Sequence, residues 1–254
     1  MNMTRKISNI SIVGYGFVGR AMAKFFHSQG VEVRQILLRK LPQERDEFRF
    51  ITKIELLQVC DLLLVCVNDD ALLDLIPQLP KSQWIAYTSG AVGLEVFNNA
   101  PHISVFYPLQ SFAFLPDGVM TQVPILIESS NREHTQTLKN FVETHFDICQ
   151  EMDSASRSKL HLAAVFANNF SNHLMTSAAQ YCVQNKVDFN LLKPLILETA
   201  KKWMNHDPST LQTGPAIRGD ETVVAKHISQ LDGSMKAIYQ EMTASIMKFH
   251  NKHE

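Results

Sequence analysis

The stretch Gly14-Tyr15-Gly16-Phe17-Val18-Gly19 decides the fold of the first half of the chain. It follows an apolar run, Ile10–Val13, which has the composition of a buried strand, and it precedes a helix-like run from Arg20 to Phe26. A strand, a glycine-rich turn and a helix in this order are the signature of a dinucleotide-binding unit. We therefore expect the six residues of this glycine turn to bind a cofactor.

Each glycine of the turn has its own expected role. Gly14 lets the chain turn sharply off the strand, and Gly16 lets a pyrophosphate approach the backbone. Gly19 lets the helix pack closely against the strand. The free N–H groups at the start of the helix, together with the helix dipole, favour the charge of the phosphates.

The composition is that of a globular protein with no strong charge bias. The 254 residues are 45% hydrophobic and 19% charged, with a formal net charge of −1, so we expect no nucleic-acid partner. No apolar run is long enough to span a membrane, and the short stretch before the first strand leads us to expect no signal peptide. The four cysteines lack a C-x-x-C spacing and the ten histidines lack metal-ligand spacing. These features predict a cytoplasmic protein with reduced thiols and no metal; the cysteines are Cys60, Cys66, Cys149 and Cys182.

Two regions of different pattern follow one another along the chain. Up to about residue 153, short apolar runs alternate with helical patterns, which predicts an α/β domain with a mainly parallel, doubly wound Rossmann sheet over residues 1–153. The expected strands are Ile10–Val13, Val33–Leu38, Leu62–Val67, Trp84–Thr88, Ile103–Phe106, Pro124–Glu128 and, as a possible last one, Asp147–Met152.

Strand-like runs stop after this point, and residues 154–254 are expected to form an all-α domain. Its helices are expected at Ser154 to about Asn185, Asn190–Asn205, Asp220–Leu231 and Ser234–His250. Asp220 and Ser234 are candidate N-caps, and Pro194 is expected in the first turn of its helix or at a bend.

The end of the second strand indicates which dinucleotide would bind. A unit that prefers NAD carries an acidic residue there, which binds the adenosine ribose. This chain has Leu37-Leu38-Arg39-Lys40 instead, and two cations suit a 2′-phosphate. We therefore expect NADP rather than NAD, with Arg39 and Lys40 as ligands, although an exposed basic loop has the same pattern. FAD is disfavoured because nothing else in the chain indicates a flavin domain.

Polar residues follow two further strands, at the edge where α/β sheets bind ligands. Val67-Asn68-Asp69-Asp70 ends one strand; we expect Val67 and Asn68 to line the cofactor cleft and Asp70 to cap the helix Ala71–Ile76. Thr88-Ser89-Gly90 ends another strand, and these small residues permit close approach of the nicotinamide ribose. A simple turn explains Thr88-Ser89-Gly90 equally well.

The long helix carries a line of polar residues on an apolar background. His161, Asn168 and Asn172 fall within about 40° of one line at 3.6 residues per turn. Polar side chains on an apolar helix require partners, which are either protein groups and water or a ligand. Under the second interpretation, His161 is the candidate proton donor and Asn168 orients substrate or cofactor.

Two loops are further candidates for substrate contacts. Tyr107-Pro108-Leu109-Gln110-Ser111 follows a strand, and Gln110 or Ser111 could bind substrate through hydrogen bonds. The loop Thr213–Asp220 contains Arg218, which suits a substrate carboxylate or phosphate. A surface interaction between Arg218 and Asp220 is an equally good explanation of that spacing.

Together these motifs resemble a family of Rossmann-like proteins assigned as NADP oxidoreductases, which carry a C-terminal helical domain of unknown function. The resemblance covers nearly the whole chain, and its specific parts are Pro108-Leu109-Gln110-Ser111-Phe112 and Thr213–Asp220. The wider superfamily includes pyrroline-5-carboxylate reductase, ketopantoate reductase and the 3-hydroxyacid and 6-phosphogluconate dehydrogenases. In that superfamily the helical domain closes over the nicotinamide and often forms the dimer. The resemblance thus implies a homodimer through the helical domain.

The chain departs from these relatives at two places. The family's loop usually has histidine before Pro-Leu-Gln, and this chain has Tyr107. The hydroxyacid dehydrogenases carry a lysine one turn before an asparagine, where this chain has Ala164 and Val165, so that lysine chemistry is not transferred.

The sequence as a whole predicts an NADP-dependent oxidoreductase. Such an enzyme would transfer hydride between nicotinamide and a small carbonyl, hydroxyl or imine substrate in a cleft between the domains, with catalytic roles for His161, Asn168 and Arg218. The alternatives are an NADP-binding sensor or scaffold without turnover, and a deazaflavin-dependent NADP reductase.

Overall fold

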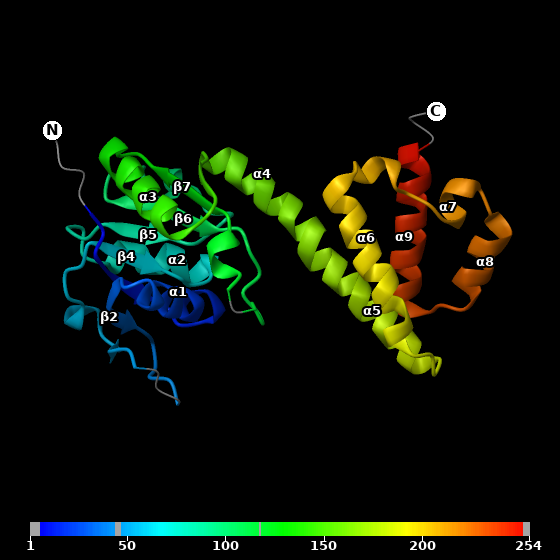
Figure 1. Cartoon of the computed structure of the whole chain (residues 1–254), viewed down its shortest axis with the longest axis horizontal. Helices are drawn as coiled ribbons and strands as arrows, with labels where there is room; N and C mark the ends of the chain where they lie inside the picture. Colours follow the sequence, from blue (N-terminus) through cyan, green and yellow to red (C-terminus); the bar gives the residue numbers. More distant parts are fainter. Residues whose placement is uncertain (1–5, 44–46, 117, 251–254) are drawn as a thin grey trace. The chain divides into compact units, whose positions relative to one another are not determined.

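The chain forms two compact units, residues 1–169 and residues 170–254. The computed structural model describes residues 6–43, 47–116 and 118–250 (Figure 1). The last strand ends at Glu151 and the next helix begins at Ser154. The first part of the long helix nevertheless belongs to the first unit.

A single sheet of eight strands organises the first unit. The strand order is β3-β2-β1-β4-β5-β6-β7-β8, and every neighbouring pair is parallel except β6 with β7. The strands are β1 (Asn9–Val13), β2 (Glu32–Leu37), β3 (Phe50–Ile51), β4 (Leu62–Val65), β5 (Ile85–Tyr87), β6 (Ile103–Pro108), β7 (Ile125–Ser129) and β8 (Cys149–Glu151). The first six follow the doubly wound dinucleotide-binding order, whose direction reverses between β1 and β4. The predicted Rossmann fold is confirmed.

Helices cover both faces of this sheet because its strands are apolar on both sides. Ile10 and Ile12 of β1 pack with α1 (Phe17–Ser28) and α3 (Arg132–His145) in one core cluster. Val13 belongs to the opposite cluster, with α2 (Asp69–Leu75) and three 3₁₀ turns, η1 (Ile54–Leu56), η2 (Ile76–Gln78) and η3 (Leu94–Phe97). A further turn, η4 (Met120–Gln122), precedes β7.

The predicted strands are confirmed to within a few residues at their ends, including the last one. The sequence did not predict β3, a two-residue strand beside β2. All four cysteines are free thiols. Within the described ranges no helix has both the length and the apolar character needed to cross a membrane.

The long helix contains a stretch of different winding. It runs as α4 (Ser154–Ala164), a π-helix η5 (Val165–Phe170) and α5 (Ser171–Gln184). Bonding from residue i to i+5 widens each turn. The predicted alignment of His161 with Asn168 and Asn172 used 3.6 residues per turn, so it does not hold across this segment.

The second unit is helical throughout the residues described. After α5 it contains η6 (Phe189–Leu192), α6 (Lys193–Asn205), η7 (Pro208–Thr210), α7 (Pro215–Arg218), α8 (Glu221–Ser229) and α9 (Gly233–His250). Pro194 lies in the first turn of α6, as predicted. Asp220 occupies the N-cap position of α8 but makes no side-chain capping bond. Ser234 is not an N-cap, because α9 already begins at Gly233.

The described part of the second unit, residues 170–250, has almost no buried apolar side chains. Among its described residues, 170–250, Cys182 is the only buried hydrophobic side chain. Large apolar side chains on α6 are exposed instead, including Leu195, Trp203 and Met204.

Candidate cofactor and active site

The glycine turn has the geometry that a bound pyrophosphate requires. Gly14 has φ +92°, and a Cβ there would collide with the carbonyl oxygen of Cys66 on the neighbouring strand. A Cβ on Gly19 would collide with the carbonyl oxygen of Gly14, so the helix packs against the turn as predicted. A Cβ on Gly16 would meet nothing within 4 Å, which leaves open space where the pyrophosphate is expected.

The N-terminus of α1 is available to an anion. Gly16 is its N-cap residue, and no side chain caps the helix in the described part of the chain. The first turn contains no acidic residue. The helix therefore offers backbone N–H groups and the positive end of its dipole to a phosphate.

A cavity of about 610 Å³ extends from the glycine turn across the ends of β1, β2 and β4. Its volume lies within the usual range of cofactor sites. Its lining includes six of the predicted cofactor residues: Gly14, Tyr15, Gly16, Arg39, Val67 and Asn68.

Other predicted residues do not line this cavity. Phe17 is largely exposed, Val18 packs against the core and Gly19 is buried. Lys40 is exposed beside Arg39, outside the cavity lining. Asp74 of α2 lines the cavity although the sequence did not single it out.

The helix after β4 is capped two residues earlier than predicted. Asn68 is the N-cap of α2, and its Oδ1 accepts a hydrogen bond from the amide of Ala71 at 3.1 Å. Asp70 lies inside the first turn, so its predicted role as the cap is wrong. Asn68 has the extended backbone that a cap needs, with ψ 159°, and therefore both caps α2 and lines the cavity.

A second cluster lies at the carboxyl ends of β5 and β6. The hydroxyl of Tyr107, on β6, lies 2.9 Å from Nδ1 of His161, on α4. Gly90 lies against both rings, since a Cβ there would come within 2.7 Å of Tyr107 Cζ and of His161 Nδ1. Tyr107 is buried and His161 half-buried. The fold thus brings together two predicted residues, Gly90 and His161, with one that was noted only as a departure.

Thr88 and Ser89 are engaged in the turn itself. The Thr88 hydroxyl donates to the carbonyl of Val65 at 3.3 Å. Ser89 Oγ accepts bonds from the amides of Ala91 and Val92 at 3.1 and 2.9 Å. These bonds match the simple-turn interpretation of Thr88-Ser89-Gly90, and the predicted contact of these residues with a ribose stays a prediction.

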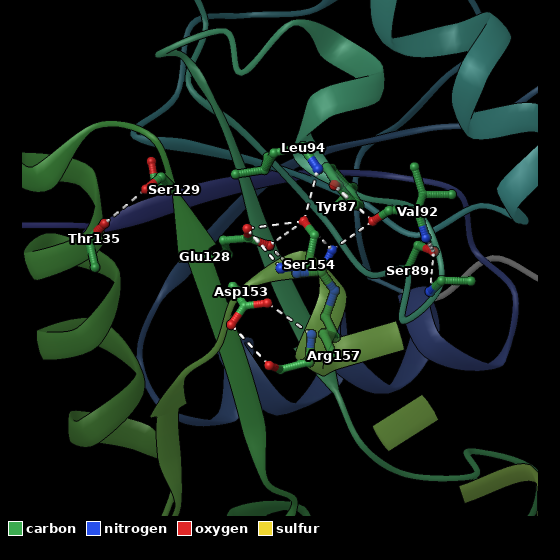
Figure 2. Close-up of polar contacts among 12 residues, drawn as sticks. Tyr87, Ser89, Val92, Leu94, Glu128, Ser129, Thr135, Asp153, Ser154 and Arg157 are labelled. Atoms are coloured by element: carbon green, nitrogen blue, oxygen red, sulfur yellow. Dashed lines mark hydrogen bonds and ion pairs between the residues drawn. The ribbon is translucent and has the colours of Figure 1, made fainter. Parts of the chain in front are cut away.

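A buried ion pair fixes this turn to α4 (Figure 2). Arg157 is fully buried and pairs through Nη1 with the carboxylate of Glu128 on β7. Its Nη2 donates to the carbonyl of Val92 at 2.7 Å. Ser154 donates to Glu128 and accepts from the amide of Leu94 at 3.1 Å. Because Arg157 lies one turn before His161 on the same helix, the pair sets the position of His161 relative to β5 and β6.

The electrostatic environment keeps the Tyr107 phenol protonated. Burial raises the pKa of Tyr107, and the nearby Arg157 cation partly opposes this by lowering that pKa. Burial also raises the pKa of Tyr87 on the neighbouring strand. Both phenols are therefore hydrogen-bond donors at neutral pH.

The other two predicted catalytic residues, Asn168 and Arg218, are both exposed. Asn168 is exposed on the π-helix. Arg218 is exposed and pairs with Asp220, at 2.7 Å from its Nη2. This is the surface interaction that the spacing also allowed, and the anion-binding role of Arg218 stays a prediction.

Known proteins match both the second half of the chain and the chain as a whole. Residues 123–246 match a family described as "Domain of unknown function (DUF2520)". The chain is 30% identical to a "putative NADP oxidoreductase" from Bacteroides fragilis, over 95% of this chain and 98% of that chain, with a TM-score of 0.87. The chain belongs to this family of Rossmann-like NADP oxidoreductases. No curated protein matches the sequence.

Two further solved structures share the fold at lower sequence identity. A protein from Thermotoga maritima is 20% identical over 96% of this chain and 99% of that chain, with a TM-score of 0.70. A pyrroline carboxylate reductase from Plasmodium falciparum, solved with NADP bound, is 12% identical over 94% of this chain and 98% of that chain, with a TM-score of 0.58. At this identity the likeness shows the fold alone.

Sequence reasoning missed Tyr107 and Arg157 as members of the second cluster. Tyr107 stands in an apolar strand, where an aromatic residue is ordinarily part of the core. Arg157 is 29 residues from Glu128 in sequence, so nothing local indicates the pair. The single available signal was the departure from histidine at position 107.

Proposed function

We propose that the protein is an NADP-dependent oxidoreductase that acts on a small carbonyl, hydroxyl or imine compound. The observation that carries this proposal is the open space at Gly16, next to the uncapped N-terminus of α1 and continuous with a cavity that Arg39 lines. Family membership supports the same activity.

The residues of the cavity fit this cofactor. The amides at the start of α1 would bind the pyrophosphate, and Arg39 would bind the 2′-phosphate through charge-assisted hydrogen bonds. Lys40 would add a second positive charge beside Arg39. In a sheet of this order the second nucleotide extends past the reversal point toward β4 and β5. That direction supports a nicotinamide site near Gly90 and His161.

Bound NADPH would supply hydride, and the chain would supply orientation and a proton. His161 is the proton donor in this proposal, because an imidazole N–H can pass a proton to a substrate atom within hydrogen-bond reach. Asn168 and Arg218 are proposed to bind substrate. The proposed substrate is a small molecule.

Calorimetric titration with NADPH, NADH and FAD tests the proposal. We expect NADPH to bind at micromolar concentration and NADH more weakly, while FAD does not bind. A failure of both pyridine nucleotides to bind at millimolar concentration would refute the function. A panel of small oxo acids and cyclic imines with NADPH then separates an enzyme from a sensor that binds cofactor without turnover.

We also propose that the second unit forms a homodimer. A helical unit with Cys182 as its only buried hydrophobic side chain among residues 170–250 does not bury enough apolar surface to be stable alone. A second copy, meeting the exposed Leu195, Trp203 and Met204 of α6, would supply the missing core. Light scattering after gel filtration should give about twice the chain mass of 28.8 kDa. A monomer that unfolds cooperatively would contradict this proposal.

The free thiols support a reducing compartment such as the cytoplasm. Burial raises the pKa of Cys66 to about 12, which keeps this thiol protonated and inert beside the glycine turn.

A further inference from the structure

We propose that Tyr107 is a positioning residue that fixes the tautomer of His161, so that Nε2 carries the proton which the substrate receives. The inference rests on the proposed oxidoreductase function and gives that function its proton path. It depends on three features of the second cluster: the direction of the Tyr107 hydrogen bond, the fit of Gly90 and the buried Arg157.

The direction of the hydrogen bond follows from the burial of the phenol. Tyr107 is 8% exposed, and a buried O–H group without an acceptor is costly. Nδ1 of His161, at 2.9 Å, is the acceptor that the described residues offer it. When Nδ1 accepts, the neutral ring carries its proton on Nε2. Tyr107 therefore donates, and the half-buried His161 is left with Nε2–H as its free donor.

Because Gly90 has no side chain, the rings of Tyr107 and His161 can meet beside it. Any larger residue would place a Cβ within 2.7 Å of both Nδ1 and the Tyr107 ring. Such a contact is closer than real Cβ atoms make, so a side chain at this position would separate the pair. Gly90 is itself in the turn that Ser89 and Arg157 hold in place through Val92.

Proton supply through the pair balances as follows. As the substrate atom becomes negative, it takes the proton of Nε2, and Nδ1 takes the proton of the Tyr107 hydroxyl. His161 stays neutral with its proton now on Nδ1, and the negative charge remains on the Tyr107 phenolate. Burial, which raises the pKa of Tyr107, disfavours that phenolate, and the Arg157 cation partly offsets this cost. A proton from solvent then restores the phenol.

The tautomer can be measured without turnover. ¹⁵N chemical shifts of the imidazole at about pH 8.5, where an ordinary histidine is neutral, distinguish Nε2–H from Nδ1–H. The signals are assigned with a His161→Gln variant. We expect a predominant Nε2–H form in the wild type, and a mixture in Tyr107→Phe and in Gly90→Ala.

Tyr87→Phe is the matched control. Tyr87 is also buried, on the adjacent strand, and its hydroxyl bonds to the carbonyl of Val92 at 3.1 Å rather than to His161. The Tyr87→Phe variant should therefore leave the His161 tautomer unchanged. A predominant Nδ1–H form in the wild type, or an unchanged tautomer in both Tyr107→Phe and Gly90→Ala, would overturn the inference.

Kinetics separates this inference from the proposed function. With a panel substrate that is turned over, Tyr107→Phe should lower kcat at least tenfold, while the KM for substrate and the Kd for NADPH change less than twofold. If NADPH does not bind to the wild type, the proposed function fails, and the tautomer measurement still decides the role of Tyr107. If NADPH binds and Tyr107→Phe turns over like the wild type, the inference alone fails.

Discussion

Adding one methyl group at Gly16 and, separately, at Gly19 should separate cofactor binding from folding. The two glycines lie three residues apart in the same turn, but their surroundings are opposite. A Cβ on Gly19 would lie 2.2 Å from the carbonyl oxygen of Gly14, whereas ordinary contact begins at 3.4 Å. A Cβ on Gly16 would have no neighbour within 4 Å.

The magnitudes follow from these distances. In Gly19→Ala the colliding atom belongs to the backbone and has no rotamer that would move it away, so α1 must shift off the sheet. Overpacking of this kind costs about 1–3 kcal/mol, and we expect the upper end of that range. Gly16 has φ −73° and ψ −163°, which alanine adopts without strain, so Gly16→Ala should change stability by less than about 1 kcal/mol.

For NADPH binding we expect the opposite order, with the larger effect in Gly16→Ala. The methyl group of Gly16→Ala occupies the space proposed for the pyrophosphate, and we expect at least a tenfold loss of NADPH affinity, equal to about 1.4 kcal/mol. In Gly19→Ala, if the variant folds, we expect the loss of NADPH binding free energy to be smaller than the loss in the free energy of unfolding.

Urea unfolding and calorimetry are the two assays. The buried Trp84 reports on the first unit, and Trp203→Phe removes the signal of the second. NADPH binding by Gly16→Ala that equals the wild type would refute the assignment of the pyrophosphate site. Wild-type stability of Gly19→Ala would refute the packing argument.

Three further predictions concern charge and ionisation. Arg39→Glu should weaken NADPH binding at least tenfold while NADH binding changes less than threefold, with the exposed Arg132→Glu as control; equal losses for both nucleotides would contradict the 2′-phosphate role. Glu128→Gln leaves the buried Arg157 without its counter-charge and should lower the free energy of unfolding by about 3 kcal/mol, against less than about 1 kcal/mol if the pair is unimportant. The raised pKa of Cys66, about 12 when folded, gives stability that is present below the ordinary thiol pKa and is lost as pH rises through the folded value. Between pH 8 and 10.5 the wild type should therefore lose about 2 kcal/mol more than Cys66→Ala in urea unfolding, and parallel losses would exclude this linkage.

The sequence predicted those parts of the fold whose signals are local and repeated. Most of the strands are rich in apolar residues, and the glycine turn requires specific residues at fixed spacing, so both were recognised. Strand β3 has only Phe50 and Ile51, too few for any periodicity, and it is a strand only because β2 lies beside it. The cap of α2 was misassigned because Asn68 and Asp70 are both good caps, and the choice depends on where β4 releases the chain.

The second cluster could not be predicted because its bonds join residues far apart in sequence. Tyr107 and His161 are 54 positions apart and meet only because the fold brings α4 next to the end of β6. The expected polar line along the helix identified His161 by assuming an uninterrupted α-helix, yet the π-helix begins at Val165, after His161. The predicted position of His161 is therefore unaffected by the π-helix. The predicted alignment of Asn168 and Asn172 with His161 does not hold, and the roles of these two residues have to be judged from their own contacts.

The buried ion pair explains why a charged residue occupies the most enclosed position of α4. An apolar residue at 157 would pack without the cost of desolvating a cation. The guanidinium, however, reaches Glu128 of β7 and the turn after β5 at the same time, which no apolar side chain can do. It also places a positive charge beside the Tyr107 phenol. The bonds to the Glu128 carboxylate and the Val92 carbonyl offset the desolvation of Arg157, and the same bonds fix the turn that holds Gly90 against Tyr107 and His161.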